Sequence, residues 1–133
     1  MPSNLLEISR TMVSGSPPIR HDGSILVKGN VEPDCIIDSE QDIEIVGDVF
    51  NSKIRSENGN VTVRGGIRGV SSFVFAGGDV LAQYAQNASI KAYGNITIDD
   101  FAFDSRLMAK KSVHIEKGEG RLEGGDIEAG LEI

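Results

Sequence analysis

Side chains that bind metals or act as nucleophiles are few in this sequence, and they stand far apart. The two histidines are His21 and His114, and Cys35 is the single cysteine. One cysteine excludes an internal disulfide framework and a zinc site made of cysteines alone. Cys35 stands among apolar residues in DCIID, so we expect a buried, inert thiol. We predict no catalytic residue, no metal site and no cofactor.

Glycine-rich segments suggest a second kind of chemistry, the binding of phosphate or another anion. The glycine pairs are not followed by the Lys-Ser/Thr pair and helix of a phosphate-binding loop. Arg64 and Arg68 in the segment RGGIRG are candidates for an anion site. The sequence favours a solvated corner there, because glycine permits the backbone conformations that sharp corners need.

The composition argues against several partners and locations. Thirteen basic and 20 acidic residues give a formal net charge of −7 in 133 residues. This charge disfavours nucleic acid or an anionic membrane surface as the main partner. No apolar run approaches the roughly 18 residues of a membrane span, and the N-terminal segment lacks the pattern of a signal peptide. We therefore expect a cytoplasmic protein without membrane insertion.

A short β-type motif recurs along the chain. It consists of two apolar residues separated by one position, and Asp, Asn or Ser usually precedes it. The motif begins at Ile25, Ile43, Val61, Val80, Ile96 and Val113, and Ile133 would begin a seventh copy. The intervals between these positions are 18, 18, 19, 16, 17 and 20 residues. A fixed period of this size is typical of repeat architectures.

Further apolar positions repeat in step with the motif. In the first complete turn the apolar anchors are six residues apart, at Ile25, Val31, Ile37 and Ile43. Alternate residues of a strand face the same side, so three short strands per turn would each direct apolar residues inward. The pattern predicts an all-β fold, a triangular parallel β-helix of about six turns with ~18 residues each.

The competing folds fit the spacing poorly. No stretch keeps the apolar spacing of a helix for three turns, and a flat sandwich would not keep an 18-residue register. Left-handed hexapeptide helices hold their step of six strictly, whereas turns here vary from 16 to 20 residues. The variation favours a right-handed β-helix. We place it at residues 23–133 and interpret residues 1–22 as an N-terminal flank or cap.

Longer stretches carry a resemblance that the repeat does not dictate. They are GNVEPDCI, DIEIVGDVFNSKIRS, GNVTVRGGIRG, AGGDVLAQYAQNASIKAYGNITI, DSRLMAKKSVHI and GEGRLEGGDIEAG. Together they resemble the β-helical domain of the bacterial flagellar assembly protein A family (FapA). This resemblance implies a right-handed parallel β-helix, similar to the C-terminal domain of the division inhibitor MinC and to bactofilins. The segment DDFAFDS departs from it, with Phe101 and Phe103 where smaller or aliphatic residues are expected.

The resemblance implies a non-enzymatic bacterial scaffold that binds a protein partner or copies of itself during flagellar assembly. A MinC-like module of cell division or polarity is the alternative. A carbohydrate-active or acyltransferase enzyme is disfavoured, because turns of 16–20 residues leave no room for substrate loops. Acids are also not adjacent in the predicted outward column Leu26, Glu44, Thr62, Leu81, Thr97 and His114.

Exposed hydrophobic residues are the first candidates for an interface. Where the small or aliphatic residues of a strand face the core, the large side chains between them face outward. Large exposed apolar patches usually mark binding surfaces. The predicted patch on neighbouring turns consists of Leu81, Tyr84, Tyr93, Phe101 and Phe103. The alternative is that a wider corner folds one phenylalanine into the core.

The C-terminal end of the rod is the second candidate interface. Unpaired strand edges and open apolar columns are templates for pairing with another chain. Leu131 and Ile133 favour a strand, and no capping pattern follows them. We therefore expect a homo-oligomer through end contacts, a closed two-fold dimer rather than a filament.

Overall fold

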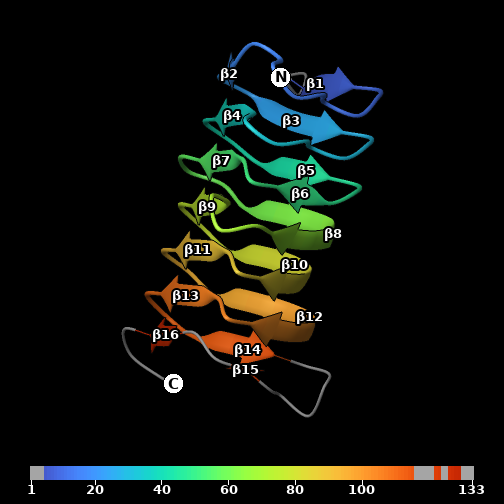
Figure 1. The fold of residues 1–133 in the computed structure, drawn as a ribbon. Helices are drawn as coiled ribbons and strands as arrows, with labels where there is room; N and C mark the ends of the chain where they lie inside the picture. Colours follow the sequence, from blue (N-terminus) through green and yellow to red (C-terminus); the bar gives the residue numbers. More distant parts are fainter. Residues whose placement is uncertain (1–4, 116–121, 124–125, 130–133) are drawn as a thin grey trace.

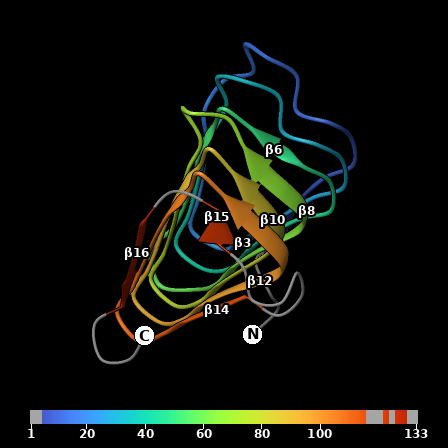
Figure 2. The same cartoon turned by 60° about the horizontal axis from the view of Figure 1, so that its bottom comes forward.

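The chain coils into a rod of stacked turns, a right-handed parallel β-helix (Figures 1 and 2). This computed structural model describes residues 5–115, 122–123 and 126–129. Within that part of the chain, no helix is long and apolar enough to cross a membrane. The predicted all-β solenoid with turns of about 18 residues is confirmed.

The first face of the rod is a parallel sheet that takes one strand from each turn. Its strands in spatial order are β1 (Leu5–Ile8), β3 (Ser24–Val27), β5 (Ile43–Ile45), the start of β8 (Val61–Arg68), the start of β10 (Val80–Gln86), the start of β12 (Ile96–Phe103) and β14 (Val113–Ile115). The predicted motif starts pair in register from Ile25 to Val113, and so does the outward column from Leu26 to His114.

The second face is built in the same way, with one strand from each turn. They are β2 (Ile19–His21), β4 (Ile36–Ser39), β7 (Lys53–Ser56), β9 (Phe73–Ala76), β11 (Ser89–Ala92), β13 (Arg106–Ala109) and β16 (Asp126–Ala129). Neighbours pair in parallel without a register shift.

The third face is shorter. Strands β8, β10 and β12 run without a break from the first face into the third. It comprises β6 (Val49–Phe50), the second halves of β8, β10 and β12, and β15 (Leu122–Glu123). A register shift between Ala82 and Tyr84 marks the corner at which β10 passes from the first face to the third. Figure 2, turned so that the bottom of Figure 1 comes forward, shows the three sides of the coil.

The core consists of stacked aliphatic columns inside the coil. Ile25, Ile43, Val61, Val80 and Ile96 are buried in one column of the first face. Burial of one such side chain contributes roughly 1.5–3 kcal/mol. None of the seven aromatic residues belongs to the buried core. The narrow coil is therefore filled by Ile, Val, Leu and Ala, with small residues near its corners.

Asp and Asn side chains connect the turns at the corner before the first face. The backbone N–H of Asn60 donates to Asp42 Oδ1 at 2.8 Å, and the N–H of Asp79 donates to Asn60 Oδ1 at 2.8 Å. The N–H of Asn95 continues the ladder to Asp79 Oδ1 at 2.7 Å. The residue that precedes each motif is therefore selected by its side-chain acceptor, because that acceptor binds the next turn.

A second corner, between the third and second faces, uses left-handed backbone conformations. Its residues in successive turns have positive φ angles: Asp34 (68°), Asn51 (43°), Gly69 (111°), Asn87 (55°) and Asp104 (48°). Asp, Asn and Gly adopt this region most readily. The chemistry of these residues thus permits a sharp bend at the same place in each turn.

Residues 5–21, which the sequence placed in an N-terminal flank or cap, form a turn of the solenoid. β1 pairs in parallel with β3, Met12 bridges to Val31, and β2 pairs with β4. Leu6 stands in register with Ile25, one interval ahead of the first predicted motif. The stack of turns therefore continues across the expected boundary between residues 22 and 23.

Val61→Asp tests the alignment of the core column. The substitution places an unpaired carboxylate at a fully buried position, so we expect the free energy of unfolding to fall by about 3 kcal/mol or more. Thr97→Asp, at an outward position between Leu81 and His114, should change it by less than about 1 kcal/mol. Urea unfolding of both variants measures the difference, and equal stabilities would contradict the alignment.

Candidate interaction surface

Tyr84 and Phe101 form an aromatic stack on the third face. They occupy adjacent rungs of β10 and β12, with ring centroids 5.2 Å apart and an interplanar angle of 7°. Gly66 occupies the preceding rung, and a Cβ at this position would overlap the Tyr84 ring. The absence of a side chain at Gly66 therefore leaves room for the Tyr84 ring and fixes its orientation. Phe101 keeps 41% of its surface exposed.

Phe103 belongs to a second outward column of the same face. In register along the rod, this column contains Phe50, Arg68, Gln86 and Phe103. The guanidinium carbon of Arg68 lies 4.4 Å from the centroid of the Phe50 ring. Phe103 itself is 39% exposed, so neither phenylalanine of DDFAFDS folds into the core. We call these two columns, Tyr84, Phe101, Phe50, Arg68, Gln86 and Phe103, the third-face strip.

The structure does not bring the other two predicted residues into this strip. Leu81 stands in the outward column of the first face, beyond the corner that precedes Tyr84. Tyr93 follows β11 and contacts Phe75 of the second face edge to face, at 5.6 Å and 79°. The expected single patch is thus divided among three sides of the rod. The reason is that each turn passes all three faces within 16–20 residues.

The second face carries hydrophobic residues that the sequence did not predict. Ile36 and Phe73 are exposed on either side of Lys53 in one outward column. They line an open groove of about 480 Å³ together with Ile37, Asp38, Ile54 and Arg55. Arg55 is paired with Asp38 at 3.4 Å and with Glu57 at 2.7 Å.

Val70 is the most exposed large hydrophobic residue in the described part of the chain, at 84%. It lies in the connection from Gly69 to Phe73, which is two residues longer than the equivalent connection from Asn51 to Lys53. This longer interval is a signal that the sequence offers, because it adds residues at a corner without shifting the strands. Val70 therefore projects at the edge where the second and third faces meet.

The first face is charged and carries few apolar side chains. Lys28 Nζ lies 3.0 Å from Glu7 Oε2, and the Lys28 ammonium holds the pKa of that carboxyl below its ordinary value. Arg64 Nε lies 2.9 Å from Glu44 Oε2. Exposed pairs of this kind contribute little to stability. Apart from Val46, which directly follows β5, the large exposed hydrophobic groups lie on the other two faces and at the N-terminal turn.

The residues expected to lack a chemical role stand apart in the structure. His114 is in the outward column of β14, whereas His21 is at the end of β2 near the opposite end of the rod. Within the described ranges, no three His, Cys, Asp or Glu side chains are grouped closely enough to hold a metal ion. The Cys35 side chain is buried, as predicted. Burial raises the pKa of its thiol, and the negative charge of Glu32 raises it further.

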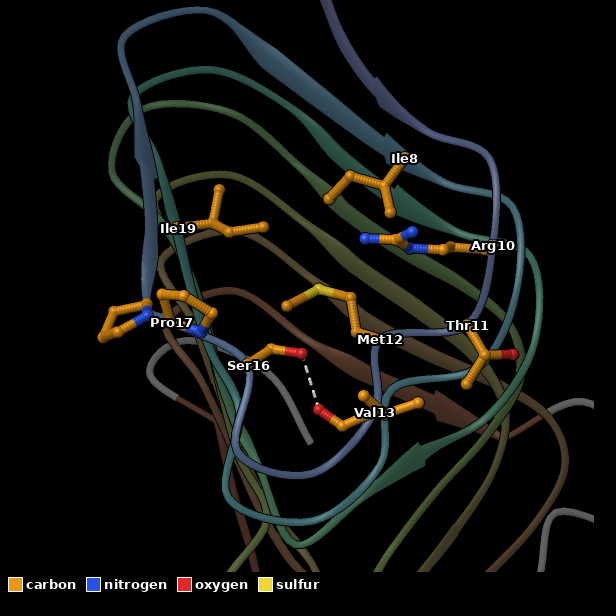
Figure 3. Close-up of a pocket in the computed structure, with 9 residues that line it drawn as sticks. Ile8, Arg10, Thr11, Met12, Val13, Ser16, Pro17 and Ile19 are labelled. Carbon is orange, nitrogen blue, oxygen red and sulfur yellow. Dashed lines mark hydrogen bonds between the residues drawn. The ribbon is translucent and has the colours of Figure 1, made fainter.

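The N-terminal turn contains a half-open hollow with mainly apolar walls. It has a volume of about 610 Å³ and is lined by Ile8, Arg10, Thr11, Met12, Val13, Ser16, Pro17, Pro18 and Ile19. Figure 3 shows Ile8, Met12 and Ile19 directed into the space from three sides of the turn. The Ser16 hydroxyl donates to the Val13 carbonyl at 2.6 Å and closes one corner. Leu131 and Ile133, the predicted C-terminal contacts, lie outside the described residues.

The geometry defines a β-solenoid repeat protein with a charged face and two faces that carry exposed aromatic groups. Residues 13–133 match the family model of the Flagellar Assembly Protein A beta solenoid domain. The chain belongs to this family, which confirms the resemblance seen in its sequence. No curated protein and no solved structure was found to match the chain.

Proposed function

We propose that this domain is a non-enzymatic scaffold that acts in the bacterial cytoplasm, binding a protein partner during flagellar assembly. Membership of the family supports a role in flagellar assembly, and the position of the aromatic residues supports the binding of a protein partner. All seven aromatic residues stand outside the core, and Tyr93, Phe73, Phe101 and Phe103 are exposed. The proposal rests on this number of exposed aromatic side chains.

Energetic reasoning explains why exposed rings favour binding. A Phe or Tyr side chain that becomes buried removes about 150–250 Å² from water. The fold covers part of each ring, and a partner that covers the exposed remainder, 41% at Phe101 and 39% at Phe103, gains its burial. Tyr and Arg are also enriched among the residues that dominate interface energies. The third-face strip combines both types, with Arg68 over the Phe50 ring and Tyr84 stacked on Phe101.

The double variant Phe101→Ser/Phe103→Ser tests this surface in a strain whose own copy of the gene is deleted. Both side chains are exposed, so the variant should fold, but it should fail to restore flagella. Leu26→Ser/Leu81→Ser removes apolar groups from the first face and should restore them. Electron microscopy counts the flagella, and circular dichroism of the purified variants checks folding.

Two results of that experiment would contradict the proposal. Full restoration by the phenylalanine variant would exclude the third-face strip as the binding surface. A deletion strain with normal flagella and misplaced division sites would favour the MinC-like alternative instead.

We further propose that the domain associates with itself through its ends. Open ends of a β-solenoid combine unpaired strand edges with apolar columns, which favour burial at roughly 25 cal/mol per Å². At the N-terminal turn, β1 and β2 are the terminal strands of their sheets, and the apolar hollow lies between them. At the other end, the proposal rests on the apolar, strand-forming residues Leu131 and Ile133.

Sedimentation velocity across a concentration range tests the end contact. We expect the wild-type chain to form dimers and Leu131→Lys/Ile133→Lys to remain monomeric. Val13→Lys, at an exposed position of the N-terminal turn, is the matched variant for the opposite end. Dissociation by Val13→Lys and not by the C-terminal pair would move the contact to the N-terminal end. A monomeric wild type at high concentration would contradict self-association.

A further inference from the structure

The two arginines of RGGIRG have different surroundings. Arg64 donates from Nε to Glu44 Oε2 at 2.9 Å, so a carboxylate of its own chain neutralises it. No carboxylate of residues 5–115 lies within ion-pair distance of Arg68. The guanidinium of Arg68 instead lies over the Phe50 ring, 4.4 Å from its centroid. Among residues 5–115, Arg68 thus contacts an aromatic ring instead of an acid.

Contact with the Phe50 ring positions the Arg68 guanidinium for a bidentate contact. The contact limits the rotation of the group. A guanidinium carries five N–H donors, so donors remain for a further partner. Two parallel donors match the two oxygens of one carboxylate, and this charge-assisted pair is among the strongest hydrogen bonds in proteins.

A groove brings further donors to the same place. It has a volume of about 300 Å³ and is lined by Phe50, Asn51, Arg68, Gly69, Gln86 and Asn87. Asn51, Gly69 and Asn87 have positive φ angles at the same corner of successive turns, and this corner forms one wall of the groove. A side chain at Gly69 would overlap the Asn51 amide, so glycine keeps this wall open. Asn51 Oδ1 accepts a hydrogen bond from the Ser71 N–H at 3.0 Å, which holds the side-chain amide in place.

Exposed apolar groups flank this polar centre. Val70 follows Gly69 directly, and its side chain is 84% exposed. Phe103 stands next to Gln86 in the same column and is also exposed. The arrangement is a cation with amides in the middle and apolar groups on both sides. It therefore suits an acidic residue within a short apolar segment.

We propose that this groove binds one carboxylate, the side chain of an Asp or Glu flanked by apolar residues in a partner protein. The inference rests on the proposed function and names the chemistry of its partner. One guanidinium matches one carboxylate, whereas a polyanion would need several cations. The net charge of −7 also opposes the approach of a polyanion such as nucleic acid.

Nuclear magnetic resonance of the isotope-labelled full chain tests the groove with defined probes. The probe is the capped tripeptide acetyl-Leu-Glu-Phe-amide, and its matched control contains Gln in place of Glu. We expect saturable shifts of the Arg68 Nε–H signal and of the Gln86 and Asn87 side-chain amides. The control peptide should bind about tenfold more weakly, because it lacks the charge-assisted pair.

Variants of the two arginines separate the groove from general charge effects. Arg68→Gln should abolish the saturable shifts, whereas Arg64→Gln removes the same charge from the same segment and should leave the affinity within about twofold. Circular dichroism confirms that both variants fold. Equal binding of the two peptides, equal effects of the two variants, or no saturable shift would overturn the proposal.

Inorganic phosphate at matched ionic strength is the final arm of the test. Weaker binding of phosphate than of the Glu peptide supports a carboxylate site, and tighter binding at the same signals would overturn it. The flagellation assay with Phe101→Ser/Phe103→Ser leaves Arg68 in place and tests the third-face strip as a whole. A failed peptide titration beside a positive flagellation assay would therefore reject the groove and leave the proposed function standing.

Discussion

The in-register stacking of successive turns is the constraint on which this molecule depends. Each turn donates its backbone N–H groups to the turn before or after it, so equivalent residues stand above one another along the rod. A slip of one residue would exchange the inward and outward sides of a strand. The ladder from Asp42 through Asn60 and Asp79 opposes such a slip, because each side chain accepts a bond from one specific backbone group of the next turn.

The same constraint organises the surface into columns. Whatever one turn presents outward lies within about 5 Å of what the next turn presents, so neighbours in a column interact directly. Glu44 and Arg64 belong to successive turns and neutralise each other, and Tyr84 and Phe101 stack. Arg68 follows Phe50 and not an acid, so it keeps its charge for a partner. Chemical differences between faces thus arise from which side chains happen to be one turn apart.

Much of the fold was predictable from the sequence, because the inward positions follow a simple period. Ile25, Ile43 and Val61 define the register, and the outward column that contains Glu44 and Thr62 follows from it. The N-terminal turn was not predicted, because Leu5 precedes its copy of the motif, Leu6 and Ile8. Later copies follow Asp, Asn or Ser. Backbone pairing with β3 compensates for this absence.

The candidate surface was less predictable, because corners decide which face a residue joins. Leu81 and Tyr84 are three residues apart, yet the register shift at Gln83 separates them onto two faces. Phe50 and Phe103 are far apart in sequence, yet they share one column with Arg68. Val70 depends on a local insertion of two residues, which a search for regular intervals overlooks. The sequence pattern predicts the strands of each turn more readily than the outward residues that meet in one column.

Removal of one whole turn tests the stacking constraint most directly. Deletion of residues 43–60 takes out the 18-residue interval between Ile43 and Val61 and joins Asp42 to Val61, so an Asp still precedes the strand. Deletion of residues 43–51 removes half as much chain but shifts the register by half a turn. Thermal unfolding followed by circular dichroism should show a cooperative transition for the longer deletion and none for the shorter one. A shorter deletion that unfolds as cooperatively as the longer one would contradict the account.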